Sequence, residues 1–397
     1  MNHASRRTGD TEPVTVRVEV SPAMLQWARA RSGIDDDVWV KRFPRYDTWL
    51  AGESNPTLRQ LEEFARKTYT PVGFFFLDEP PTENIPVPDF RTIGDRPVAG
   101  GVTANLLDTL YICLARQEWY RDSQLLNGES PLEFVGTATL RTEPAQAAAS
   151  MRERLAWTPG LRERLTSWDA ALAALRENAE AAGVLVMISG VVGSNTQRKL
   201  APEEFRGFAL ADPYAALVFV NGADSKTAQV FTLAHELAHL WLGSTALSDV
   251  EPMSVRSFDE ERWCNQVAAE LLVPLDEFER AFDRVGDLRS QLRPLAERFR
   301  VSTQVILGRV REMGALSWDQ FMAELRIERE RVAAIVTERA GGGNYYTTKP
   351  VQVGKRFARE LIASTLEGRT TYTEAFRLLG VKKTSTFEGL GQQLGVL

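Results

Sequence analysis

The sequence contains few of the features that mark several large classes of protein. Its 397 residues include only two cysteines, Cys113 and Cys264, which lie far apart along the chain. Such usage argues against a disulfide framework and against a cysteine-rich zinc site. No run of about 18 apolar residues predicts a membrane span. The first 13 residues lack the apolar core of a secretory signal. We therefore expect a cytoplasmic protein that does not bind membranes.

An excess of charge of one sign is also absent. The net charge is −6, and 25% of the residues are charged, so the chain as a whole has no marked attraction for nucleic acid. An apolar content of 44% is ordinary for a globular protein. The length allows two or three domains.

Histidine is scarce as well, and its placement is the main functional signal. Of three histidines in the chain, His235 and His239 lie four residues apart in the segment 231–243. Residues at i and i+4 share one face of an α-helix, so both imidazoles can reach one metal ion. Glu236 completes the H-E-x-x-H pattern, in which the glutamate takes a proton from a zinc-bound water.

The residues around this pattern predict a helix. Leucines recur at helical spacing, at Leu233, Leu237 and Leu240. Ser225 or Asp224 can cap the start of the helix, and Gly243 suits its end. The alternative is a buried amphipathic helix that carries two histidines by chance, and the scarcity of histidine argues against it.

Short apolar runs ahead of this helix predict strands near residues 184–188, 205–210 and 217–220. A small sheet that leads into the metal helix of a mostly helical chain indicates an α+β fold. Two interpretations of Asn221, at the end of the third strand, remain open. It binds an extended peptide substrate that adds to an edge strand, or it forms a plain Asn-Gly turn.

A catalytic zinc site needs a third protein ligand beside two histidines. The remaining histidine, His3, lies in a polar tail, so we expect a carboxylate ligand. The segment 258–274 is typical of a helix that ends at proline, and it offers Asp259, Glu260, Glu261 and Glu270. Acidic residues at a helix start also complement the helix dipole, so these residues alone leave the choice open.

Both helices resemble those of the ImmA/IrrE metallopeptidases. The shared motifs are the H-E-x-x-H helix and E-x-x-C-N followed by A-A-E-L-L-V-P over residues 261–274, where the family has alanine in place of Cys264. The segments N-T-Q-R-K from residue 195 and E-F-R-G-F from residue 204 extend the likeness. The resemblance implies a zinc cofactor with Glu261 as third ligand. It also implies an intracellular endopeptidase whose protein substrate is a transcriptional repressor or a stress or toxin–antitoxin regulator.

Further site residues follow from these placements. Asn265 lies one helical turn beyond Glu261 on the same face, where it can hydrogen-bond a metal ligand. Cys264 is either packing or a thiolate ligand. Candidates for stabilising an oxyanion are Tyr214, Arg206 and Arg256.

The N-terminal 77 residues resemble the helix-turn-helix domain of the Xre/Cro-like repressors. The matching residues are W-L-A-G at 49–52 and P-T-L at 56–58. Between Phe43 and Trp49 there is room for about one helical turn, interrupted by Pro44, where the family has most of its recognition helix. Basic and acidic residues nearly balance in this block, which gives no phosphate-binding face. DNA binding and protein contact both remain open.

A second helix-turn-helix pattern, at residues 292–314, is rich in arginine and has Ser302 as a cap. It predicts either a DNA-binding element or a helical hairpin that packs on the peptidase domain. The expected domains are a helix-turn-helix module 1–77, a Pro-rich linker 78–102, a peptidase domain 103–280, a helical region 281–340 and a helical tail 341–397. The alternative function is a DNA- or toxin-binding regulator whose metal site is structural or vestigial.

Overall fold

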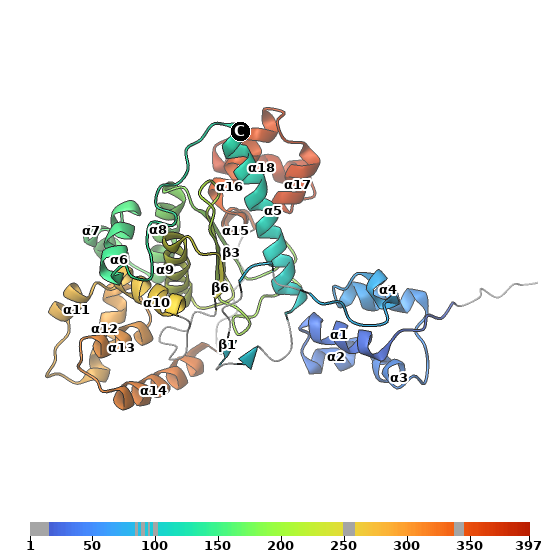
Figure 1. Cartoon of the computed structure of the whole chain (residues 1–397), viewed down its shortest axis with the longest axis horizontal. Coiled ribbons are helices and arrows are strands. Elements are labelled where there is room, and N and C mark those ends of the chain that lie inside the picture. The colour runs from blue at the N-terminus through green and yellow to red at the C-terminus, as the bar shows by residue number, and fades with distance from the viewer. Residues whose placement is uncertain are drawn as a thin grey trace, which may run out of the picture. The chain divides into compact units, whose positions relative to one another are not determined.

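The computed structural model shown in Figure 1 is mostly helical with one small mixed sheet, as expected for an α+β protein. It describes residues 16–83, 86–88, 92–93, 96–97, 102–248, 259–336 and 345–397. The chain divides into two compact units. The first unit comprises Met1–Asn84 and Ala99–Leu107, and the second unit comprises Ile85–Val98 and Asp108–Leu397. Among the described helices, none is long and apolar enough to cross a bilayer.

The first unit is a small helical module with an aromatic core. Its described elements are α1 (Pro22–Ser32), α2 (Asp36–Arg42), α3 (Tyr46–Leu50), α4 (Leu58–Lys67) and the 3-10 helix η1 (Val72–Phe76). The start of α4 is fixed by a capping box, in which Thr57 and Gln60 exchange backbone-to-side-chain hydrogen bonds. The buried rings of the core are Trp39, Phe43, Tyr46, Trp49, Phe64 and Phe75.

A short hairpin lies within the segment predicted to be a linker. Strands β1 (Thr92–Ile93) and β2 (Arg96–Pro97) pair in antiparallel fashion. Just ahead of them, the carbonyl oxygen of Pro88 accepts a hydrogen bond from the backbone N–H of Leu247 in the second unit's sheet, at 3.0 Å. The Ile85–Val98 part of this segment accordingly groups with the second unit.

The second unit is built on a four-stranded sheet in the order β3-β5-β4-β6. Its strands are β3 (Leu185–Ser189), β4 (Gly207–Leu210), β5 (Leu217–Asn221) and β6 (Ala246–Ser248). β3 and β5 are parallel, and β4 is antiparallel to both of its neighbours. The expectation of an edge strand at Asn221 is wrong, because β5 pairs on both sides and the edges are β3 and β6.

Both faces of the sheet are covered, so its strands are continuous apolar runs. Val186 and Val218 point into the core formed with α8 (Trp168–Ala181) and α9 (Lys226–Leu242). Met187, which faces the opposite way, contacts Cys113 of α5 (Ala104–Leu126). Figure 1 shows α8 and α9 on one side of the sheet and α5 on the other.

Helices that precede and follow the sheet in the chain extend the same core. These are α6 (Pro144–Arg154), α7 (Pro159–Arg164), α10 (Asp259–Leu272), α11 (Leu275–Ala281), α12 (Leu288–Phe299), α13 (Thr303–Glu312) and α14 (Trp318–Val336). Ser302 caps α13 as predicted, by accepting from the Val305 N–H at 3.3 Å. Buried side chains of α12 and α13, including Leu295 and Ile306, belong to the core around α9 and α10. The arginine-rich hairpin therefore packs as part of the second unit.

The C-terminal helices belong to the second unit and contact the rest of it through buried polar side chains. They are α15 (Tyr345–Val353), α16 (Lys355–Leu366), α17 (Tyr372–Leu379) and α18 (Thr384–Leu394). The side chain of Lys349 is 1% exposed, and its Nζ donates to Ser194 Oγ at 2.5 Å. Ser194 Oγ in turn donates to the Gly380 carbonyl at 2.8 Å. Burial, aided by the charge of Arg116, lowers the pKa of Lys349 to about 7.

Candidate metal centre

The helix that carries the H-E-x-x-H pattern is α9, and its ends are those predicted. Ser225 Oγ accepts from the Ala228 N–H at 3.3 Å, and Gly243 ends the helix in the left-handed conformation with φ of 70°. Nearly every residue between these caps is buried, because α8, α10 and the sheet surround the helix. His235 and His239 are completely shielded from solvent.

Three potential metal ligands converge between α9 and α10. The Nε2 atoms of His235 and His239 lie 3.0 Å apart, and each lies 3.2 Å from a carboxylate oxygen of Glu261. A tetrahedral zinc ion with bonds of about 2.0–2.1 Å places its ligand atoms about 3.3 Å apart, so this donor set fits zinc. Among the described residues, this is the one group of three or more histidine, cysteine or acidic side chains whose ligand atoms lie close enough together to hold a metal ion.

Asn265 lies next to this cluster, as the helical spacing predicts. Its side-chain oxygen is 3.0 Å from Nδ1 of His235. An amide oxygen only accepts hydrogen bonds, so Nδ1 carries a ring proton, and Nε2, which faces Glu261, is the nitrogen that can bind a metal ion once it is deprotonated. The contact therefore holds His235 in the tautomer and orientation that a metal ligand needs.

Electrostatics within the cluster suit a cation. Burial opposes ionisation of Glu261, but the nearby charge of His235 and hydrogen bonds from both histidines hold the pKa of Glu261 well below its usual range. Burial lowers the pKa of His235. Burial also acts to lower the pKa of His239. Interactions with Cys264, Glu260 and Glu261 outweigh burial, so the pKa of His239 is raised well above its usual value. A metal ion must displace that proton, so metal binding weakens as pH falls.

Two neighbours on α10 surround the second histidine. Nδ1 of His239 lies 3.7 Å from a carboxylate oxygen of Glu260, a contact that the sequence did not single out. Cys264 is fully buried, and this burial raises the pKa of its thiol to about 11. Its Sγ atom is not part of the group of close ligand atoms formed by His235, His239 and Glu261, which favours the packing interpretation of Cys264 over thiolate ligation.

The carboxylate of Glu236 lies against a glycine of β4. A Cβ atom at Gly207 would be 2.8 Å from Oε1 of Glu236 and 2.7 Å from Cγ2 of Thr232. Only glycine leaves room for Glu236 in this position. Gly207 lies within the E-F-R-G-F segment, but its role is not apparent from the sequence, because the close approach is created by packing of β4 on α9.

The other residues predicted for the site lie outside the metal cluster or form hydrogen bonds and ion pairs that stabilise the fold. Asn221 is fully buried; its amide donates to the Phe205 carbonyl at 3.0 Å, and its oxygen accepts from the Ala223 N–H at 3.0 Å. These bonds hold the turn after β5. Arg206 lies 3.7 Å from Asp224.

Among the other acidic residues of α10, Asp259 is exposed, and Glu270 forms an ion pair with Arg309 at 2.5 Å. The backbone N–H of Tyr214 is bonded to Asp212 in a turn after β4. Arg256 lies outside the described residues. None of these contacts adds a fourth donor to the cluster.

Comparisons with known proteins agree with this geometry. Residues 179–311 match the model of the IrrE N-terminal-like domain, a peptidase family. This region contains the four-stranded sheet, α9, α10 and the α12–α13 hairpin, and it supports the ImmA/IrrE family and a metallopeptidase-like function. Residues 353–393 match a domain of unknown function, DUF8813. No curated protein matches the chain.

Proposed function

We propose that this chain is an intracellular zinc-dependent endopeptidase that hydrolyses a peptide bond in a regulatory protein. The observation that carries the proposal is the convergence of His235, His239 and Glu261, whose ligand atoms all lie within 4.8 Å of one another inside the core. The match of residues 179–311 to a peptidase family supports it.

The ligand set favours a catalytic site over a structural one. His235 and His239 would hold the ion through Nε2, and Glu261 through its carboxylate. Structural zinc sites are closed by four protein ligands, whereas catalytic sites have three and keep one position open. When bound, zinc supplies Lewis acidity, which lowers the pKa of water and polarises a carbonyl group.

Glu236 supplies the acid–base chemistry. It lies between the two histidines on α9, and its carboxylate is held beside Gly207 on the neighbouring strand. From this position Glu236 takes a proton from the attacking water and passes it to the leaving amine. Asn265 contributes indirectly, because it fixes the ring orientation of His235.

The substrate assignment rests on the family resemblance, in which the cleaved proteins are transcriptional repressors or stress or toxin–antitoxin regulators. The alternative is a DNA- or toxin-binding regulator with a structural or vestigial metal site. That alternative does not explain the presence of Glu236, because Glu236 is not one of the metal ligands and has no role in a purely structural site.

Glu236→Gln tests the proposal, because it keeps the shape of the side chain and removes the base. A proteome-derived peptide mixture is incubated with each zinc-loaded protein, and new termini are identified by mass spectrometry. We expect wild type and the exposed control Glu163→Gln to generate the same termini. Glu236→Gln should retain zinc and lose at least about 100-fold in rate. Equal cleavage by Glu236→Gln, or a zinc-loaded wild type that cuts nothing, would contradict the proposal.

A further inference from the structure

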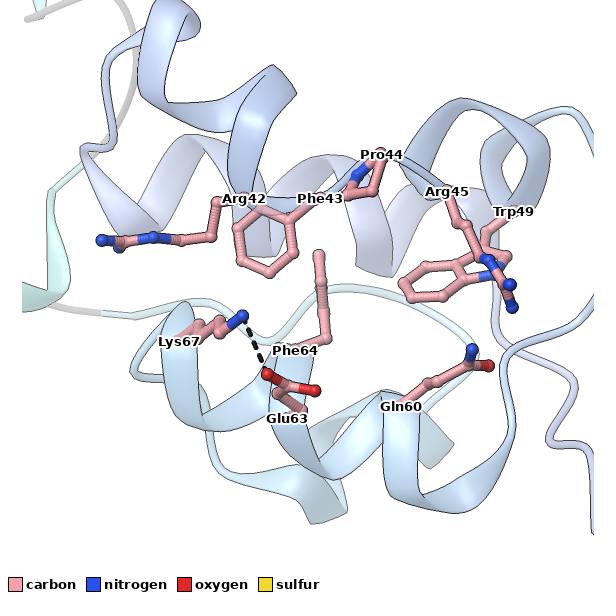
Figure 2. A pocket seen from close by; sticks show the side chains of 9 residues that line it. All are labelled: Arg42, Phe43, Pro44, Arg45, Trp49, Gln60, Glu63, Phe64 and Lys67. Atoms are coloured by element: carbon pink, nitrogen blue, oxygen red, sulfur yellow. Dashed lines mark ion pairs between the residues drawn. The ribbon is translucent and has the colours of Figure 1, made fainter.

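The first unit contains a pocket that the peptidase proposal does not use. It has a volume of about 170 Å³ and lies between the turn that joins α2 to α3 and one face of α4. This volume holds roughly ten water molecules, enough for one large apolar side chain and the backbone beside it. Figure 2 shows the pocket with its lining side chains.

The floor of the pocket is aromatic and rigid. The rings of Phe43 and Phe64 pack edge to face with centroids 5.0 Å apart, and Trp49 packs on Phe64 in the same manner at 5.9 Å. Interlocked rings of this kind hold a fixed apolar surface. An apolar side chain that enters the pocket therefore meets a preformed site.

Positive charge lies at both ends of the pocket. Figure 2 shows Arg42 and Lys67 toward one end and Arg45 beside Gln60 toward the other. Lys67 forms an ion pair with Glu63 at 2.8 Å. Arg42 and Arg45 are exposed, and among the described residues neither forms an ion pair. Two guanidinium groups are thus available to anions on either side of an apolar centre.

The short α3 explains why the pocket is open. Pro44 separates α2 from α3, and α3 contains only the five residues Tyr46–Leu50. The pocket therefore opens beside the turn at Pro44, between Phe43 and Trp49, where the chain has room for only about one helical turn.

A nucleic acid fits the pocket less well than an acidic peptide does. Base stacking requires an exposed ring face, whereas Phe43, Trp49 and Phe64 are only 7%, 8% and 1% exposed, so the aromatic floor is recessed and a narrow side chain reaches it more readily than a flat base does. Binding of a polyanion also requires an excess of basic residues, whereas acidic residues outnumber basic ones in residues 16–83. Two separated positive ends match a short segment with a few carboxylates.

We propose that this pocket binds an acidic linear segment of a partner protein. One apolar side chain of the segment enters the aromatic floor, and acidic residues on either side of it pair with Arg42 and Arg45. The segment lies extended along the pocket, because the two guanidinium groups are at opposite ends. This binding does not depend on the peptidase activity of the second unit.

The test uses the full chain and a phage-displayed library of random 12-residue peptides. Peptides are selected on wild type and on Arg42→Glu/Arg45→Glu. The matched control is Arg59→Glu/Arg66→Glu, which makes the same change in charge at exposed positions of α4 that do not line the pocket. Thermal unfolding verifies that all three proteins are folded.

We expect peptides enriched on wild type and on the control to carry an apolar residue with acidic residues on both sides. A fluorescein-labelled enriched peptide should bind Arg42→Glu/Arg45→Glu about tenfold more weakly than wild type. Its counterpart with Asn and Gln in place of Asp and Glu should be weakened to a similar degree. The control should stay within about twofold of wild type.

Three results would overturn the proposal. The first is that no peptide is enriched on wild type over Arg42→Glu/Arg45→Glu. The second is that the enriched peptides lack acidic residues. The third is that a single-stranded dT 12-mer binds wild type more tightly than any selected peptide and is lost in the same variant, which would assign the pocket to nucleic acid.

Discussion

Alanine at position 207 would place a methyl group between β4 and α9, directly against the carboxylate of Glu236. The added carbon would lie 2.8 Å from Oε1 of Glu236, 2.7 Å from Cγ2 of Thr232 and 2.9 Å from the Phe219 carbonyl oxygen. All three distances are shorter than van der Waals contact. Because the Phe219 carbonyl belongs to the paired backbone of β5, the side chains of α9 must give way.

The expected cost has two parts. Insertion of one methyl group into a packed core costs about 1–3 kcal/mol of stability. Displacement of a catalytic group by about 1 Å lowers the rate about 100-fold. Gly207→Ala should therefore remain folded with a lower melting temperature and lose about 100-fold in kcat/KM. Zinc content should not change, because none of the three atoms close to the new methyl group belongs to the ligand set.

Three measurements on one protein sample decide the outcome. These are zinc content by mass spectrometry, thermal unfolding, and cleavage of a peptide identified with wild type. Gly160→Ala is the control, since a Cβ at Gly160 in α7 meets no atom within 4 Å. Full activity in Gly207→Ala would refute the placement of Glu236. Joint loss of zinc and activity would place the defect at the ligands instead.

Three further substitutions follow from the structure. Glu261→Ala should lose zinc under conditions in which wild type keeps about one ion per chain, and full occupancy would remove Glu261 from the ligand set. Asn265→Leu should weaken zinc affinity about 10–100-fold in a chelator competition, and unchanged affinity would contradict the role of its contact with His235. Burial lowers the pKa of Lys349 to about 7 in the folded chain, against 10.5 for the free side chain, so the folded state binds fewer protons between these values. The free energy of unfolding of wild type should therefore rise from pH 7 to pH 10 by up to about 4 kcal/mol. Lys349→Met should remove this rise in urea titrations, and parallel pH profiles would contradict the assignment.

Local signals made α9 predictable. Ser225 and Gly243 act through hydrogen bonds and backbone conformation within a few residues of themselves, so they fix the ends of the helix whatever surrounds it. The spacing of His235 and His239 also depends only on helical geometry. These features required no knowledge of the rest of the fold.

The third member of the cluster could not be chosen from local spacing. Glu260 and Glu261 are adjacent, and either can lie near a histidine when α10 packs on α9. In the structure, Glu261 approaches both histidines through their Nε2 atoms, whereas Glu260 approaches only Nδ1 of His239. The packing angle and rotation of α10 decide between them, and the resemblance to a known family supplied this information indirectly.

Strand order was also beyond local reasoning. β3, β4 and β5 are all short and fully buried, so their residues do not distinguish a central strand from an edge strand. β6 was not predicted, although it pairs with β4 and forms one edge of the sheet. Its three residues follow the metal helix directly and are too few to produce an alternating pattern.

The arginine-rich hairpin shows why the charge of a segment does not establish its function. Arg309 of α13 is 3% exposed; it pairs with Glu270 at 2.5 Å and donates to the Val273 carbonyl at 2.8 Å, both at the C-terminal end of α10. Arg152 donates to the Glu270 carbonyl at 2.7 Å. Arg309 and Arg152 thus satisfy the last carbonyls and oppose the negative pole of the helix that carries Glu261. Arg309 is thus unavailable to phosphate groups. The hairpin instead stabilises the C-terminal end of α10, the helix that contributes Glu261 to the metal centre.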